Sequence, residues 1–175
     1  CTVRSVDRDQ DDYVSRIWTV GIDGQDRRQF TRGPGTDHSP RWSPDGSRLA
    51  FLSDRSKTSQ VHLLERGGGE AAPCGQLPGA VSDLCWMPDG KALLATAAVT
   101  VDPDWRGERA NGREPRQRKV LPQVAWKLPY KSDGLGYMLA REIHLFRLDA
   151  GSGEHRQLTD GAFDVMAFDV SRDGQ

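Results

Sequence analysis

The sequence has no long hydrophobic run and no excess of charge of either sign. Its longest apolar stretch, Ala92 to Val99, is far shorter than the roughly 20 residues that a membrane-spanning helix needs. The 24 basic and 25 acidic residues nearly cancel, so no global field points to nucleic acid or to an anionic membrane as a partner. No signal peptide is visible. We therefore predict that the protein binds neither nucleic acid nor membrane.

Cysteine is scarce as well. Cys1, Cys74 and Cys85 are an odd number of thiols without the spacing of a metal site. We expect these thiols to be reduced, and on that ground we predict a cytoplasmic location. The alternative is a lipoprotein processed at Cys1. It is disfavoured because the residues that follow Cys1 read as a strand and not as a flexible tether.

The sequence patterns of catalysis are also missing. There is no Gly-x-Ser-x-Gly elbow, and the nearest sequence, Gly151 to Gly153, falls in an expected strand-to-strand turn. The histidines are scattered, and none can be paired with a nucleophile: His38, His62, His144 and His155. Neither a phosphate-binding glycine loop nor a Cys/His metal constellation is present. We predict no catalytic residue, no metal ligand and no cofactor in this chain.

What the sequence does contain is a repeated turn. The turn glycines Gly46, Gly90 and Gly174 are 44 and 84 residues apart. Thr31 and Thr159 each precede a turn glycine by 15 residues. A third marker, an apolar stretch that ends near glycine, occurs at 17–24, 61–68 and 143–151. A period near 44 matches the roughly 40–45 residues of a four-stranded propeller blade.

The residues around each turn fit a blade. Along 40–44, prolines and Trp42 alternate with polar residues at the two-residue period of a strand. Asp-Gly then suits a hairpin turn, because glycine adopts positive φ without steric cost. We predict an all-β fold, a partial β-propeller made of four-stranded antiparallel blades with WD-like Trp-Ser-Pro-Asp-Gly repeats. Its hairpins should lie at Asp45-Gly46 and Asp89-Gly90, with Trp42 and Trp86 packed between blades.

The repeat also predicts where the blades begin and end. Residues 1–31 read as the end of a blade and 37–77 as a complete blade; 81–159 read as a complete blade with an insertion at 100–141, and 164–175 as the start of the next. Within the first blade, 7–15 reads as an acidic loop. His62 and His144 are assigned to equivalent positions, which argues for a structural role. The spacing of 84 leaves open a further blade hidden in the insertion. Lacking an initiator Met and stopping just past an Asp-Gly turn, the chain is predicted to be a fragment.

The insertion is the candidate functional segment. Its first half, 105–119, holds six basic residues against two acidic ones and lacks apolar periodicity. Its second half carries aromatic residues and a Gly-rich turn. The candidate contacts with a partner or a substrate carboxylate are Arg106, Arg109, Arg113, Trp126 and Tyr130. The alternative is a solvated surface loop without a role.

These residues together resemble a known family. The Trp-x-Pro-Asp-Gly blades, the pattern Tyr130-Lys131-x-Asp133-Gly134-x-Gly136-Tyr137, and the strand and Gln-Leu-Thr-Asp-Gly turn that follow occur in this order. The chain resembles the N-terminal β-propeller domain of the prolyl oligopeptidase family of serine peptidases, in its acylaminoacyl-peptidase-like branch. The resemblance covers essentially the whole chain. The Trp-Ser-Pro-Asp-Gly repeat by itself also occurs in TolB-type propellers.

The resemblance implies a seven-bladed propeller stacked on a C-terminal α/β-hydrolase domain, which would carry the catalytic residues and is absent here. It implies a non-catalytic, substrate-gating propeller of a serine peptidase that cleaves short or acylated peptides. The hydrolase domain and a peptide would then be its partners. With open blade faces, the isolated chain is predicted to self-associate. Which kind of peptidase the parent is stays open.

Two other functions stay open at this point. One is a TolB-type binding propeller that acts in protein–protein interaction without an enzyme domain. The other is an enzyme that works through a metal in a propeller's central channel. The latter would need carboxylate, Asn or His side chains converging from the inner strands, which here are mostly apolar or carry Pro and Trp.

Overall fold

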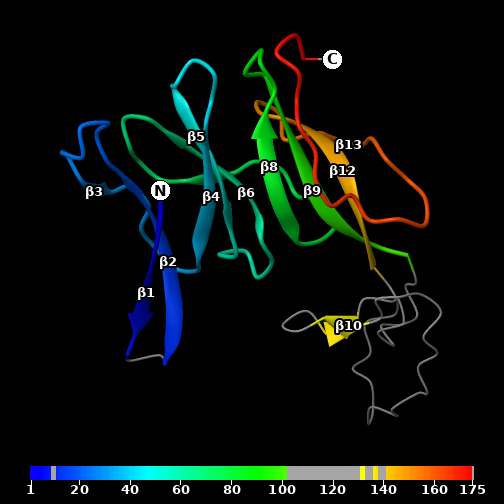
Figure 1. The fold of residues 1–175 in the computed structure, drawn as a ribbon, viewed down its shortest axis with the longest axis horizontal. Helices are drawn as coiled ribbons and strands as arrows, with labels where there is room; N and C mark the ends of the chain where they lie inside the picture. Colours follow the sequence, from blue (N-terminus) through cyan, green and yellow to red (C-terminus); the bar gives the residue numbers. More distant parts are fainter. Residues whose placement is uncertain (9–10, 102–130, 133–135, 138–140, 175) are drawn as a thin grey trace.

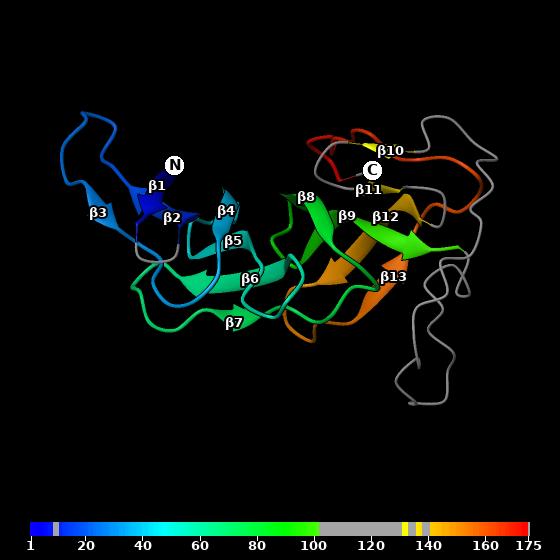
Figure 2. The same ribbon diagram turned by 90° about the horizontal axis from the view of Figure 1, so that it is seen from below.

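The computed structural model describes residues 1–8, 11–101, 131–132, 136–137 and 141–174. This part of the chain is all β and has no helix, which confirms the predicted fold class. Three antiparallel sheets stand side by side along the long axis of the molecule (Figures 1 and 2). The first sheet has the order β1-β2-β3, the second β4-β5-β6-β7, and the third β13-β12-β9-β8; β10 and β11 form a separate pair.

The strands of the first sheet are β1 (Thr2–Asp7), β2 (Asp12–Thr19) and β3 (Arg28–Gln29). Those of the second are β4 (Asp37–Trp42), β5 (Arg48–Ser53), β6 (Gln60–Glu65) and β7 (Ala72–Pro73). Those of the third are β8 (Val81–Trp86), β9 (Ala92–Thr100), β12 (Arg141–Asp149) and β13 (His155–Gln157). The short pair consists of β10 (Lys131–Ser132) and β11 (Gly136–Tyr137).

Both predicted Asp-Gly hairpins are confirmed. Gly46 and Gly90 have φ values of 69° and 66°, the left-handed region that favours glycine. The amide of Gly46 donates to the carbonyl of Ser43 at 2.8 Å, which closes the turn between β4 and β5. The Asp45 carboxylate accepts hydrogen bonds from the Ser43 hydroxyl at 2.6 Å and from the amide of Ser47 at 3.1 Å. These bonds to the charged form lower the pKa of Asp45 to about 2.

The predicted acidic loop at 7–15 is wrong. Residue Asp12 already begins β2, and β1 pairs with β2 from Thr2↔Ile17 to Asp7↔Asp12. Aspartates lie close together in sequence at the end of the long β1–β2 ribbon. Polar residues at the tip of a ribbon have the same sequence pattern as a loop. At the other end of the chain, 164–174 was predicted to start with a strand, but these residues form none. The amide of Val165 does donate a hydrogen bond to the carbonyl of Ile143 in β12 at 2.8 Å. A turn does form there, with Gly174 at φ 76°.

The core lies mainly between the second and third sheets. It is built by buried apolar side chains of both: Ala50, Leu52, Val61, Leu84, Trp86, Leu93, Ala95, Phe146 and Leu148. Trp86 is 6 % exposed and its indole Nε1 donates to the carbonyl of Arg41 at 2.9 Å, as expected of a residue between blades. Trp42, at the equivalent position one sheet earlier, packs on Phe30 with ring centroids 5.7 Å apart but stays 43 % exposed. The prediction of buried packing thus holds for Trp86 and only partly for Trp42.

Equivalent hydrogen bonds reveal the repeat in three dimensions. The hydroxyl of Thr31 accepts the amide of Ile17 at 3.0 Å, and that of Thr159 accepts the amide of Leu145 at 2.9 Å. Each threonine lies two residues past the outermost strand of its sheet, β3 or β13, and the bond ties it to the neighbouring strand, β2 or β12. The two threonine markers therefore have one structural cause.

Backbone hydrogen bonds correct the predicted alignment of His62 with His144. The amide of Cys74 donates to the carbonyl of Val61, and the amide of Leu158 donates to that of Leu145, so Val61 corresponds to Leu145. His62 then corresponds to a phenylalanine, and His144 to Gln60. The predicted equivalence of the two histidines is wrong by two residues. A strand alternates with a period of two, so a shift of two residues leaves its pattern unchanged in sequence.

Candidate functional site

The candidate residues of the insertion, Arg106, Arg109, Arg113, Trp126 and Tyr130, lie outside the described residues, as does any hidden blade at 102–130. The structure does describe where the insertion is attached. β9 and β12 pair from Leu148↔Leu93 out to Arg141↔Thr100. The insertion thus leaves the third sheet at the end of this hairpin, at the lower edge in Figure 1.

The described end of the β9–β12 hairpin, up to Thr100 and Arg141, is one projection at this edge, and the β1–β2 ribbon is a second one. The long side chains of Arg16 and Gln60 each hold the linker to the next sheet: Arg16 donates to the carbonyl of Gly33 at 2.7 Å, and Gln60 to that of Gly79 at 2.9 Å. Because Arg16 and Gln60 make the same contact, they occupy equivalent positions in their sheets. The pair Val3↔Arg16 of the first sheet therefore corresponds to the pair Ser53↔Gln60 of the second sheet, where the hairpin of the second sheet ends. The β1–β2 ribbon continues past this level. We call the edge that bears both projections the ribbon face (Figure 1).

Between the two projections, a buried ion pair fixes the start of the inner strand β4. The carboxylate of Asp37 is fully buried, and its Oδ1 lies 2.8 Å from a guanidinium nitrogen of Arg55. Arg55 also donates to the hydroxyl of Ser53 at 2.8 Å. Within the described part of the chain, Oδ2 of Asp37 has no hydrogen-bond partner. Such a pair holds its loop firmly, because loss of one partner leaves a buried charge uncompensated.

Two buried histidines lie near this face, and each is in contact with other residues of its own sheet or of the segment that follows it. His62 stacks at 5.8 Å from Phe51, and its pKa is lowered, chiefly by burial. His144 lies 3.6 Å from a carboxylate oxygen of Glu142 and 3.3 Å from the hydroxyl of Thr159. That hydroxyl already accepts the amide of Leu145, so its place is structural. Both histidines therefore support the sheets.

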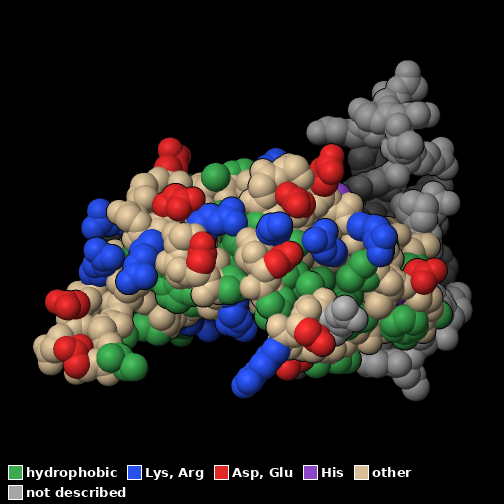
Figure 3. Space-filling view, turned by 90° about the horizontal axis from the view of Figure 1, so that it is seen from above, with side chains coloured by type: hydrophobic (Ala, Val, Ile, Leu, Met, Phe, Trp, Pro, Cys, Tyr) green, Lys and Arg blue, Asp and Glu red, His purple; other side chains and the backbone are tan. Residues whose placement is uncertain are grey.

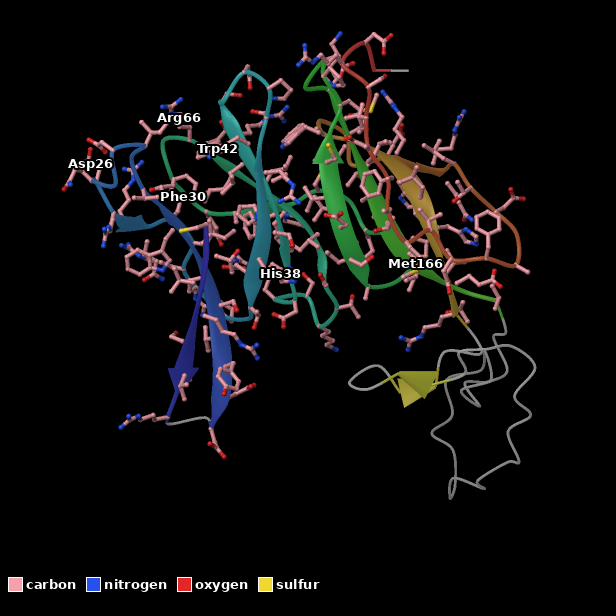
Figure 4. All side chains as sticks on the ribbon, viewed as in Figure 1. Asp26, Phe30, His38, Trp42, Arg66 and Met166 are labelled. Carbon is pink, nitrogen blue, oxygen red and sulfur yellow. The ribbon has the colours of Figure 1, made fainter. Side chains whose placement is uncertain are left out.

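The opposite edge carries a groove between the first two sheets. It has a volume of about 870 Å³ and includes Trp18, Val20, Trp42, Leu49 and Arg66 among its lining residues. Figure 4 labels Trp42 and Phe30 side by side, with Arg66 above them. Figure 3 looks onto this edge of the molecule, where basic and acidic side chains are interspersed with hydrophobic ones. The groove offers apolar contact area, but the histidines lie elsewhere.

The described residues bear on two further classes of function, metal binding and membrane insertion. Among them, no three His, Cys, Asp or Glu side chains are grouped so that they could hold a metal ion. None of the elements in this part of the chain is a helix with the length and apolarity to cross a membrane. The three cysteines are free thiols, with Cys74 buried. Burial is the main cause that raises the pKa of Cys74 to about 11, so this thiol is unreactive near neutral pH.

The curated proteins to which the chain is similar include peptidases. The chain is 34 % identical over 172 residues to YuxL of Bacillus subtilis, an uncharacterized peptidase; the match covers 97 % of this chain and 25 % of YuxL. It is 29 % identical over 117 residues to dipeptidyl-peptidase 5 of Porphyromonas endodontalis, covering 67 % of this chain and 16 % of that protein. These matches bear out the predicted resemblance to the propeller domain of a peptidase of the prolyl oligopeptidase family. The chain spans only about a quarter of the length of YuxL. No family model matches it.

TolB proteins are similar to a smaller part of this propeller segment. The TolB homolog of Chlorobium luteolum is 41 % identical over 69 residues, which is 39 % of this chain and 15 % of that protein. Among solved structures, the acylaminoacyl peptidase of Pyrococcus horikoshii superposes with a TM-score of 0.65 at 16 % identity, over 90 % of this chain and 23 % of that one. A TolB protein of Agrobacterium tumefaciens gives 0.56 at 18 % identity, over 89 % and 43 %. The structures share the fold with this chain.

Proposed function

We propose that this chain is the non-catalytic propeller of a serine peptidase and that it gates the access of peptides to a separate α/β-hydrolase domain. The observation that carries the proposal is the similarity to YuxL, which runs along nearly the whole chain and leaves three quarters of that peptidase outside it. A catalytic domain has room in the remainder. The parent is proposed to cleave short or acylated peptides, as in the acylaminoacyl-peptidase-like branch.

The described residues support a gating role and not a chemical one. Of the two buried histidines, His62 is held by a strand carbonyl, and His144 by a hydroxyl and a neighbouring carboxylate. Two projections rise from the ribbon face on either side of the Asp37–Arg55 pair, which keeps the shorter hairpin between them in place. Rigid sheets with projections along one edge can restrict what passes, while the reaction takes place elsewhere.

The second candidate is a binding propeller of the TolB type. It is favoured by the match to the Chlorobium luteolum protein, whose local identity of 41 % exceeds that to YuxL. That match covers about one and a half blade repeats, and each repeat carries turn and packing residues that any such blade needs. The peptidase proposal accounts for more of the chain.

The full-length parent separates the two functions. A fluorophosphonate probe should label one serine of the parent and should leave the 175-residue chain unlabelled, since its nucleophile would lie in the other domain. If the parent is not labelled and has no peptidase activity, the TolB-type function replaces the proposal. Labelling of the purified chain itself would show that the propeller is not the non-catalytic part.

The gating step needs its own measurement. In the parent, 104–119 is replaced by a Gly/Ser linker of equal length, and kcat/KM is measured on peptides of increasing length. The matched control keeps the segment and changes only Arg106, Arg109 and Arg113 to Ser. Length-dependent changes in the first variant support gating, and a loss in the second assigns the contact to the arginines. Unchanged kinetics at every length in both variants would remove this segment from the function.

Three further proposals concern the chain's surroundings. We propose the hydrolase domain as its permanent partner, and a cytoplasmic location because its three cysteines are free thiols. We also propose that the isolated chain self-associates, because large apolar side chains such as Ile22, Phe163 and Met166 are at least half exposed. Sedimentation at high micromolar concentration tests the last point, which a strictly monomeric sample would contradict.

A further inference from the structure

The β1–β2 ribbon extends beyond the blade to which it belongs. The pair Val3↔Arg16 lies at the level of Ser53↔Gln60, where the second sheet ends its hairpin. In the second sheet, the inner strand β4 reaches the same level with Asp37, which pairs with Ser53. A strand in the position of β4 would therefore stop beside Val3. The outer edge of β1 from Arg4 onward projects past the blade and is not covered by its architecture.

The hydrogen-bonding groups of this edge point outward. Cys1 and Trp18 exchange two hydrogen bonds, at 2.8 and 2.9 Å, so they form a hydrogen-bonded pair of the antiparallel ladder. Such pairs alternate with pairs whose N–H and C=O groups point away from the partner strand. By this alternation, Val3 and Ser5 bond to β2, whereas Arg4 and Val6 present their amides and carbonyls outward. In the described part of the chain, no strand lies on that side of β1.

The side chains of the ribbon also suit a bound segment. Val3, Val6 and Tyr13 are 42 %, 60 % and 55 % exposed, and the guanidinium of Arg4 lies 4.1 Å from the ring centre of Tyr13. A two-stranded ribbon alone is only marginally stable in water, so a third strand would stabilise it. Its sequence from 2 to 13 carries four aspartates against two arginines. A bound segment with basic residues would match this charge.

We propose that the outer edge of β1 binds an extended, basic peptide by strand addition, with the amides and carbonyls of Arg4 and Val6 pairing with the peptide backbone. A peptide fits better than a second copy of the chain. A strip of six residues is about 20 Å long and about 10 Å wide, roughly 200 Å², which is well below the ~800 Å² per partner of a stable protein interface. In addition, self-pairing centred on Arg4 would place like charges opposite one another.

This site gives the ribbon face a role in handling peptides. Binding at the edge needs no catalytic group and can be measured on the 175-residue chain alone. That the bound peptide is afterwards cleaved rests on the proposed function. A failure to bind would leave the serine labelling of the parent untouched, and an unlabelled parent would leave peptide binding untouched. The two proposals therefore fail separately.

The probe is the peptide acetyl-Lys-Val-Thr-Val-Thr-Lys-amide, added to the chain in increasing amounts. Amide hydrogen exchange is followed residue by residue by NMR. At saturation we expect the exchange of the Arg4 and Val6 amides to slow at least about tenfold. The amide of Ser5, which already bonds to β2, is the internal control and should change less than twofold. Analogues with N-methylated valines or with Glu in place of Lys should bind at least tenfold more weakly.

Two variants at one position complete the test. Val6→Pro removes the outward amide and leaves the bonds of Ser5 to β2, since proline is tolerated at a strand edge; it should weaken binding at least tenfold. Val6→Thr keeps the amide and should bind within threefold of the unchanged chain. Circular dichroism confirms that both variants are folded. Equal binding by Val6→Pro, or equal binding of the Glu analogue, would overturn the proposal. So would protection of Arg4 that rises with protein concentration when no peptide is present.

Discussion

Arg48 is expected to hold the second and third sheets together. From β5, its guanidinium donates to the carbonyl of Ala150 at 3.2 Å and to that of Gly90 at 3.1 Å, both in turns that join strands of the third sheet. It also lies 5.3 Å from the ring centre of Trp86, the residue buried between the sheets. One side chain thus makes three contacts across the boundary. Changing Arg48→Met removes the charge and the donors but keeps an apolar chain of similar length.

The expected loss of stability follows from these contacts. A hydrogen bond from a charged donor contributes about 1.5 kcal/mol at the lower end of its range, and a cation–π contact about 0.5–1 kcal/mol. The methionine recovers about 1 kcal/mol through contact of its thioether with Trp86. The free energy of unfolding should therefore fall by about 2.5–3 kcal/mol. For a chain of this size, that corresponds to a decrease in Tm of roughly 5–12 °C.

Arg41→Met is the matched control. Arg41 also bridges these two sheets, but its partner Asp83 is 3.5 Å away and both side chains are about half exposed. An exposed pair contributes little, so this variant should lose less than about 0.5 kcal/mol. Its main-chain carbonyl still accepts the indole of Trp86. Urea unfolding, followed by tryptophan fluorescence, compares the two. Losses that agree within 0.5 kcal/mol would refute the reasoning that Arg48 joins the sheets.

Three further predictions follow from the turns and the thiols. The pKa of Asp45 is lowered to about 2, from its usual 3.8, so its stabilising effect is complete above pH 4 and is lost as the pH falls towards 2. The variant Asp45→Asn should therefore have a free energy of unfolding that depends less on pH in this range. The pKa of Cys74 is raised to about 11, from its usual 9.0, so its neutral thiol favours the folded state below pH 9 and this effect fades as the pH rises towards 11. In the native chain at pH 8, Ellman's reagent should therefore modify exposed Cys1 at least tenfold faster than buried Cys74, and equal rates would contradict the burial. Gly75→Ala should lower the free energy of unfolding by about 3 kcal/mol or more, because Gly75 has a φ of 68° and a Cβ would lie only 2.2 Å from the carbonyl oxygen of Gly153. If the variant is as stable in urea as the unchanged chain, the segments around Gly75 and Gly153 can move apart without a cost in stability.

The sequence by itself determined the elements that depend on local chemistry. Asp45-Gly46 and Asp89-Gly90 form hairpins because glycine alone adopts the required φ at little cost. The period of 44 residues and the threonine markers were also readable, and the markers correspond to one hydrogen bond that the first and third sheets repeat. The candidate residues of the insertion could be named from their charge and aromatic character, and they remain predictions.

Only the tertiary structure decided which equivalent residues are buried and where the chain extends past a blade. Trp42 and Trp86 occupy the same place in the repeat, yet their exposures are 43 % and 6 %. The second sheet buries Trp86, whereas the first sheet covers Trp42 only in part, through Phe30. The histidine register and the β1–β2 ribbon were misread for a related reason. A shift of two residues preserves strand alternation, and a polar tip resembles a loop. Pairing partners that are distant in sequence, such as Gly79 for Gln60, resolve both cases.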